Sequence, residues 1–83
     1  MIDVKEAYDI VKSNNPGMKA YICNETKQYY EFALAPSNLA KGDAFANSVV
    51  YLVDKNTKKY EAVHFKVVME EPILREIDTT TLE

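Results

Sequence analysis

Residues 18–35 read MKAYICNETKQYYEFALA, and this pattern predicts a β-hairpin. Apolar and aromatic residues dominate 18–23 and 28–35, as they do in strands. The polar run NETK at 24–27 separates the two segments by the length of a short turn. An antiparallel sheet built around this hairpin is therefore expected.

Side-chain alternation in the second strand predicts which of its faces is covered. Successive side chains of a strand point to opposite faces, so residues two apart share a face. One set is wholly apolar or aromatic and is expected to face the core, whereas the other contains a charge. The first strand alternates less clearly, and its buried face stays undecided. The expected core set is Tyr30, Phe32 and Leu34, and the opposite set is Tyr29, Glu31 and Ala33.

The segment before the hairpin predicts a helix from residue 3 to about residue 13. Asp3, followed three residues later by Glu6, resembles a capping box with Asp in the cap position. The run NNPG at 14–17 ends the helix, because Asn and Gly tolerate left-handed geometry and Pro disfavours a helical residue before it. The apolar stripe at helical spacing consists of Val4, Ala7, Tyr8 and Val11.

The chain after residue 35 predicts a second hairpin. Residues 36–47 are expected to form a connection with a short helical turn, and 48–53 the most apolar strand. A turn at 54–58 is indicated by Asp, Asn and Thr, whose side chains bond nearby backbone groups. A fourth strand is expected at 59–69. Its expected core set is Val63, Phe65 and Val67, opposite Ala62, His64 and Lys66.

The C-terminal part predicts little further structure. Pro72 is expected to open a short helix at 73–77, and 78–83 lacks a core pattern and is expected to fray. The predicted fold class is α+β, with the N-terminal helix on one face of an antiparallel sheet of about four strands. Residues 1–77 are expected to form one domain, with 78–83 as an acidic tail.

Composition and charge exclude several function classes. The 83 residues carry a net charge of −3 and form no basic patch, so nucleic-acid binding is not expected. No apolar run is long enough to cross a bilayer, which needs about 20 residues. The N-terminus lacks the pattern of a secretory signal, and the one cysteine fits a reducing compartment. A cytoplasmic location without membrane contact is therefore expected.

Residues that could support catalysis or bind a metal are few. His64 is the single histidine and Cys23 the single cysteine, so a zinc site with four ligands cannot be assembled from them. A thiol nucleophile at Cys23 would need an imidazole beside it, and the sequence leaves open whether His64 is that partner. The run DKNT at 54–57 lacks the Gly and Glu of a calcium loop. We therefore expect no enzyme activity, metal or cofactor.

Tyrosines and C-terminal acids are the candidate partner-binding residues. Tyrosine is enriched at protein interfaces because it combines a large apolar area with a polar tip. The acidic C-terminal segment could steer a basic protein partner. The alternatives are cross-strand aromatic pairing and a solvated tail. The candidates are Tyr21, Tyr29, Tyr51, Tyr60, Glu70, Glu71, Glu76 and Asp78.

Three stretches resemble the small bacterial immunity protein 35 and YrhB-type domains. They are YYEFAL at 29–34, FANSVVYLVDKNT at 45–57 and EPI at 71–73. This chain departs from the family in carrying Lys58 where the family usually has Gly, and Tyr30 where it has Trp. The resemblance implies a cytosolic inhibitor that binds and neutralises a bacterial toxin.

Two functional hypotheses follow. The first is a small non-enzymatic protein-binding module, immunity-like, that uses the open sheet face or the acidic C-terminal segment. The second is a homo-oligomeric structural or phage-type accessory protein, in which self-association buries the third strand or an unpaired sheet edge.

Overall fold

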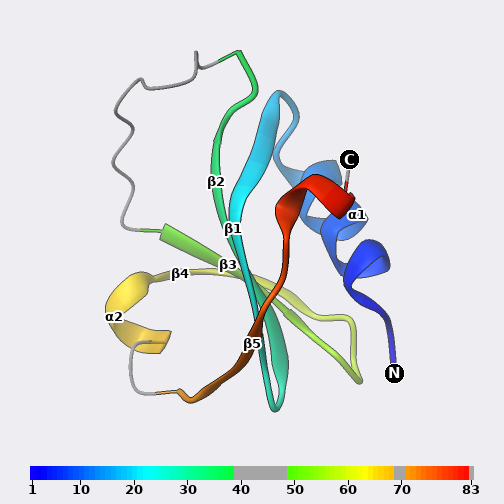
Figure 1. Cartoon of the computed structure of the whole chain (residues 1–83), viewed down its shortest axis with the longest axis vertical. Coiled ribbons are helices and arrows are strands. Elements are labelled where there is room, and N and C mark those ends of the chain that lie inside the picture. Colours follow the sequence, from blue (N-terminus) through cyan, green and yellow to red (C-terminus); the bar gives the residue numbers. More distant parts are fainter. Residues whose placement is uncertain (39–48, 69–70, 83) are drawn as a thin grey trace.

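The computed structural model describes residues 1–38, 49–68 and 71–82, and it confirms the predicted α+β fold. An N-terminal helix packs against an antiparallel sheet, which has five strands (Figure 1). The elements in chain order are α1 (Val4–Asn14), β1 (Met18–Thr26), β2 (Tyr29–Pro36), β3 (Val49–Asp54), β4 (Tyr60–His64), α2 (Phe65–Val68), β5 (Ile73–Glu76) and the 3-10 turn η1 (Thr79–Leu82).

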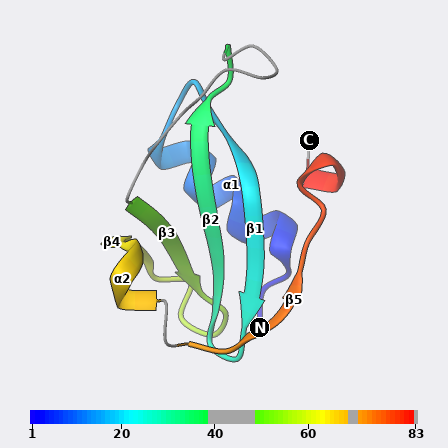
Figure 2. The same cartoon turned by 60° about the vertical axis from the view of Figure 1, so that its left-hand side comes forward.

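The strands follow the order β4-β3-β2-β1-β5, so both predicted hairpins are confirmed (Figure 2). The first turn is shorter than predicted, because β1 continues through Thr26 into the polar run at 24–27. The β1–β2 and β3–β4 hairpins lie side by side through the β2–β3 pair, and β5 joins the far edge of β1. Most of the predicted connection at 36–47 lies outside the described residues. Within the described part of the chain, no helix is long and apolar enough to cross a membrane.

Helix α1 forms as its sequence predicts. The Asp3 carboxylate accepts a hydrogen bond from the Glu6 backbone N–H at 2.9 Å, which satisfies one of the free donors of the first turn. Ala7, Tyr8 and Val11 are buried against the sheet. Burial of this stripe, rather than the modest helix propensity of the segment, holds α1 in place.

The face of β2 toward α1 is the one predicted. Tyr30, Phe32 and Leu34 are buried, and the Tyr8 and Phe32 rings stack with centroids 5.7 Å apart. Because directly paired residues share a face, the pairing of Phe32 with Tyr51 places Tyr51 on the α1 side as well.

The predicted strand at 59–69 forms only over Tyr60–His64, and its predicted core set is wrong. β4 ends at His64 and α2 follows, with Phe65 exposed. Pairing with β3 places Tyr60 and Ala62 on the α1 side, so Val63 points to the opposite face. The apolar alternation of the segment was therefore overridden by the pairing register of β3. The side chain of residue 67 lies outside the described residues.

The C-terminal predictions are also corrected. Residues 73–77 were expected to be helical, but Ile73–Glu76 forms β5, which pairs with β1. The edge of β1 offers backbone groups that a strand satisfies and a short helix does not. Residues 79–82 were expected to fray, but they form η1, whose Leu82 joins the core.

A β-bulge in β1 explains why its faces could not be assigned. Ala20 pairs with Leu34 and Ile22 with Ala33, which leaves Tyr21 as an extra residue in β1. Ala20 and Cys23 are therefore buried, while Tyr21 and Ile22 between them are both exposed. Strict alternation fails at this one position.

The β3–β4 turn is built on Asp54. Its carboxylate accepts the backbone N–H groups of Thr57 and Asn56, and these bonds, together with one from Gln28, lower its pKa to about 2. Lys58 has a φ of 64°, in the left-handed region that glycine adopts more easily. This is the position at which the resembled family usually carries Gly.

The burial of Leu82 predicts a measurable loss of stability in Leu82→Ala. Leu82 is 2% exposed, so truncation removes buried apolar surface and leaves a cavity. We expect the free energy of unfolding in urea to fall by about 2 kcal/mol, at the lower end for such changes because η1 is peripheral. Leu74→Ala is the control, since Leu74 is 62% exposed and should change stability by less than about 0.5 kcal/mol. Equal effects of the two substitutions would contradict the burial of Leu82.

Candidate functional site

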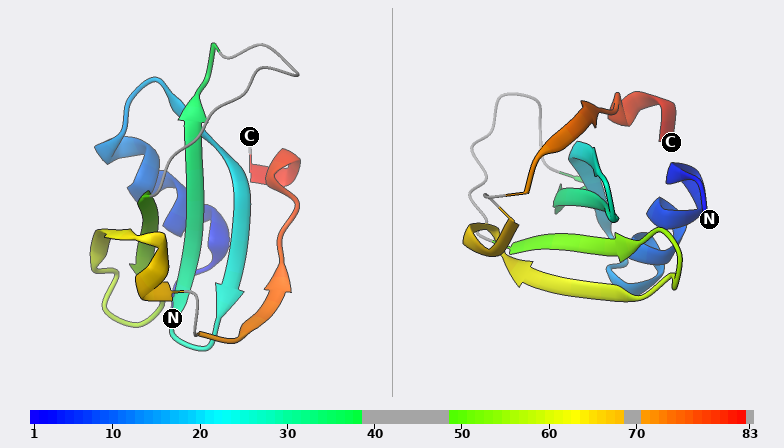
Figure 3. Two further views of the ribbon diagram at one scale, coloured as in Figure 1. Left: turned by 90° about the vertical axis from the view of Figure 1, so that its left-hand side faces the viewer. Right: turned by 90° about the horizontal axis from the view of Figure 1, so that it is seen from below.

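A pocket lies on the sheet face opposite α1. In Figure 3, α1 and α2 lie on opposite sides of the sheet. Side chains of α2 and β5 help to enclose this open-face pocket, which has a volume of about 330 Å³. Its described lining residues are Ile22, Asn24, Glu31, Phe32, Ala33, Val50, Phe65, Glu71 and Ile73.

Glu31 and Asn24 are the buried polar groups of the open-face pocket. Glu31 is 6% exposed, and its Oε2 atom has no hydrogen-bond partner in the described part of the chain. Asn24 pairs directly with Glu31 across the β1–β2 ladder, and its Oδ1 atom is also buried without a partner. Native proteins satisfy most buried polar atoms, so two unsatisfied acceptors side by side point to a site for a donor.

Burial changes the ionisation of Glu31. Desolvation, with a smaller contribution from the negative charge of Glu71, raises the pKa of Glu31 to about 7. The carboxyl group therefore exchanges its proton near neutral pH, where an exposed glutamate is fully ionised. Perturbed carboxyl groups in pockets are candidates for functional sites.

A second groove runs between β1 and the C-terminal segment. It has a volume of about 450 Å³, and it begins where β5 stops pairing with β1. The backbone N–H of Ile77 still bonds to the Cys23 carbonyl at 2.8 Å, but residues 18–22 pair with no described strand on this side. We call this the acidic groove, and its described lining residues are Tyr21, Ile22, Cys23, Asn24, Glu76, Ile77, Asp78 and Thr79.

The carboxylates of the acidic groove differ in their surroundings. Asp78 accepts hydrogen bonds from the Thr80 hydroxyl at 2.8 Å and the Thr80 N–H at 3.0 Å, and both lower its pKa. Asp78 therefore also shapes the start of η1. Glu76 is exposed and makes no ion pair among the described residues.

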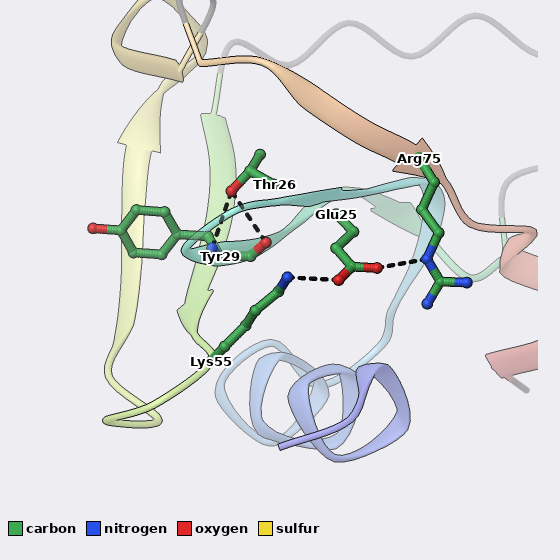
Figure 4. A network of polar contacts seen from close by, with 5 residues as sticks. All are labelled: Glu25, Thr26, Tyr29, Lys55 and Arg75. Carbon is green, nitrogen blue, oxygen red and sulfur yellow. Dashed lines mark hydrogen bonds and ion pairs between the residues drawn. The ribbon is translucent and has the colours of Figure 1, made fainter. Parts of the chain in front are cut away.

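An ion cluster on the α1 side joins a buried lysine and a largely exposed arginine through one carboxylate. Figure 4 shows the Glu25 carboxylate between the Lys55 ammonium and the Arg75 guanidinium, with one carboxylate oxygen bonded to each. These bonds, with Lys55 contributing most, lower the pKa of Glu25. The Lys55 nitrogen also lies 5.2 Å from the centre of the Tyr30 ring. The cluster ties β1 to β5 and to the β3–β4 turn, and we assign it a structural role.

The structure brings together only some of the predicted partner-binding residues. Tyr21, Glu76 and Asp78 line the acidic groove, and Glu71 lines the open-face pocket. Tyr29 lines neither, and its ring points away from the ion cluster in Figure 4. Glu70 lies outside the described residues.

Tyr51 and Tyr60, two of the predicted partner-binding residues, lie on the covered face of the sheet and not on its open face. The β3–β4 register puts both on the α1 side, where they pack against the core with ring centroids 6.2 Å apart. The Tyr60 hydroxyl accepts a hydrogen bond from the Asn15 side chain at 3.0 Å, which anchors the end of α1. The two tyrosines therefore form a cross-strand aromatic pair, which is the alternative to partner binding that the sequence left open.

The possible pairing of Cys23 with His64 is ruled out by the strand order. β3 and β2 lie between β4 and β1, which separates the two residues by about 14 Å at normal strand spacing. Burial also raises the pKa of Cys23 to about 12. His64 Nδ1 instead accepts the Lys66 N–H at 3.2 Å. Among the described residues, no three His, Cys, Asp or Glu side chains gather as a metal site.

Glu31 and Asn24 were not predicted as site residues. The alternation of β2 does place Glu31 opposite the core, among apolar neighbours, and this is the signal that sequence offers. Comparison with protein-family models, curated proteins and solved structures finds no match for this chain. The resemblance to immunity proteins therefore stays a prediction.

Proposed function

We propose that this chain is a small non-enzymatic protein-binding module that holds a basic partner in the acidic groove. The observation that carries the proposal is the meeting of Tyr21 with Glu76 and Asp78 around one groove, although they are distant in sequence. This arrangement combines an aromatic anchor with negative charge, two features of protein interfaces.

The bulge in β1 gives Tyr21 its exposure. Tyr21 is 44% exposed, and the adjacent Ile22 is exposed on the same stretch of strand. In a regular strand one of these two neighbours would have faced the core. A partner that covers both side chains would bury apolar area that the free protein leaves in water.

Charge selects the kind of partner. None of the described residues that line the acidic groove is basic, and two are carboxylates. A partner with lysine or arginine at the matching position would be steered to this groove, and salt would weaken the steering. The resemblance to immunity proteins makes a basic bacterial toxin domain, such as a nuclease, the partner we propose within this class.

Paired affinity capture tests the proposal. Unaltered protein and Tyr21→Ala/Glu76→Lys are immobilised in parallel in lysate of the source organism, and retained proteins are identified by mass spectrometry. We expect a stoichiometric basic protein whose retention falls at least about tenfold with the double substitution and also falls with added salt. Tyr29→Ala/Glu6→Lys is the matched control and should retain it.

Light scattering, which measures the molar mass in solution, distinguishes the competing hypothesis of a homo-oligomer from the proposed binding module. β4 is an edge strand with no described partner on its outer side, so self-association could extend the sheet there. A stable oligomer at micromolar concentration would favour this accessory role. The acidic groove would be contradicted as the binding site if the protein is a monomer and retains a basic protein equally well with and without the Tyr21→Ala/Glu76→Lys substitutions.

A further inference from the structure

We propose that the open-face pocket binds a small organic cation, a primary ammonium group on an apolar body, through Glu31 and Asn24. The open-face pocket shares Ile22 and Asn24 with the acidic groove, but Glu31 lines only the pocket, and the proposal does not depend on the proposed function. The proposal rests on two buried oxygens without a described hydrogen-bond partner, whose residues pair directly across the β1–β2 ladder within largely apolar walls.

The two polar atoms require a donor. When Glu31 is ionised, its Oε2 atom and Asn24 Oδ1 are both acceptors, and both are buried without a hydrogen-bond partner among the described residues. Their residues are direct cross-strand neighbours, whose Cβ atoms are typically about 5 Å apart, so one group can reach both. An ammonium group has three donors and no acceptor, so it can serve both oxygens without leaving an acceptor of its own unpaired.

Charge favours a cation over a neutral donor. Glu31 and Glu71 are carboxyl groups, and no described residue that lines the pocket is basic. Glu71 also raises the pKa of Glu31, because the two negative charges repel each other across the pocket. A bound cation would relieve this repulsion and would favour the ionised form of Glu31.

The walls favour an apolar body on the ligand. Ile22, Val50, Phe65 and Ile73 come from four different elements and surround the polar pair. Phe65 and Ile73 remain substantially exposed, so apolar surface is available for burial. The volume of about 330 Å³ lies at the lower end of the range for small-molecule sites.

NMR titration with 2-phenylethylammonium tests the proposal, and 2-phenylethanol serves as the neutral ligand of similar shape. At about pH 8 Glu31 is mostly ionised, and we expect saturable shifts of the Asn24 side-chain amide and the Ile22 and Ile73 methyl groups. The dissociation constant should lie in the millimolar range typical of fragments, and the alcohol should bind at least about tenfold more weakly.

Substitution and pH provide two independent checks. Glu31→Gln keeps the side-chain shape and should weaken ammonium binding at least about tenfold, whereas Glu61→Gln, on β4 outside the pocket, should not. In the unaltered protein, lowering the pH from about 8 to about 5.5 protonates Glu31 and should weaken binding at least about fivefold. The only other described carboxyl that lines the pocket is Glu71.

Three results of these experiments would contradict ammonium binding in the open-face pocket. Absence of saturable shifts with the ammonium ion, or equal affinity for the alcohol, would overturn the proposal. Binding unchanged in a folded Glu31→Gln variant would also overturn it. If the Glu31→Gln variant does not fold, as judged by a loss of dispersion in its NMR spectrum, the pH dependence of binding to the unaltered protein is the deciding test. Ammonium binding that does not change between about pH 8 and about pH 5.5 would then overturn the proposal.

Discussion

Glu25→Gln is expected to lower the free energy of unfolding by about 3 kcal/mol, because it leaves the Lys55 ammonium buried without a countercharge. Lys55 is nearly fully buried, and its nitrogen bonds to the Glu25 carboxylate in the ion cluster. A neutral amide offers one acceptor oxygen where the carboxylate serves both Lys55 and Arg75. The measurement is urea unfolding at pH 7, followed by circular dichroism.

Glu6→Gln is the matched control for Glu25→Gln. Glu6 also pairs with a lysine, Lys58, but both side chains are about half exposed, and such pairs contribute about 0–1 kcal/mol. Because the folded-state pKa of Glu25 is lowered, its contribution is present above the unfolded pKa and is lost as pH falls through the folded pKa. Similar losses for the two variants would contradict a buried role for the cluster.

Glu31→Gln is expected to change stability in the opposite direction to Glu25→Gln. It should raise the free energy of unfolding by about 3 kcal/mol at pH 8. The buried carboxylate costs free energy when it is ionised, and glutamine removes the charge at nearly constant shape. The new amide can also donate a hydrogen bond to the unpartnered Asn24 Oδ1 across the β1–β2 ladder. The measurement is the urea midpoint at several pH values.

The pH profile gives this prediction its sharpest form. The pKa of Glu31 rises from 4.5 to about 7 on folding, so the folded protein holds this proton more tightly than the unfolded chain does. The contribution of Glu31 to stability is therefore complete below about pH 4.5 and is lost as pH rises to about 7. Glu31→Gln should remove this loss. Glu61→Gln should keep the loss of stability between about pH 4.5 and about pH 7. An identical pH profile of stability for Glu31→Gln and the unaltered protein would refute the assignment of this loss to Glu31.

Local patterns predicted the elements whose partners are near in sequence. The α1 stripe and the alternation of β2 each contain one clear apolar face, and burial followed that face. The predicted core face of β4 was wrong because the apolar alternation at 63 and 65 conflicts with the register imposed by pairing with β3. That register places Tyr60 on the α1 side, where it packs against the core, and leaves Phe65 exposed.

The candidate site depended on contacts that local patterns do not contain. Alternation placed Glu31 on the uncovered face, but an uncovered glutamate is ordinarily solvated. Side chains of α2 and of the edge strand β5 help to enclose Glu31, and both elements arise from segments expected to have the other type of secondary structure. In the acidic groove, Tyr21 was among the predicted candidates, yet its exposure comes from a bulge that strict alternation excludes.

The pairing of β5 with β1 has a consequence for the order of assembly. Arg75 meets Glu25 across 50 positions of sequence, whereas the β1–β2 hairpin closes through a turn of a few residues. Closing the longer loop costs more chain entropy, and contacts of this kind form late in folding. During synthesis from the N-terminus, the edge of β1 therefore stays open until the final strand has emerged. For that interval the nascent chain exposes an unpaired strand edge that other strands can join.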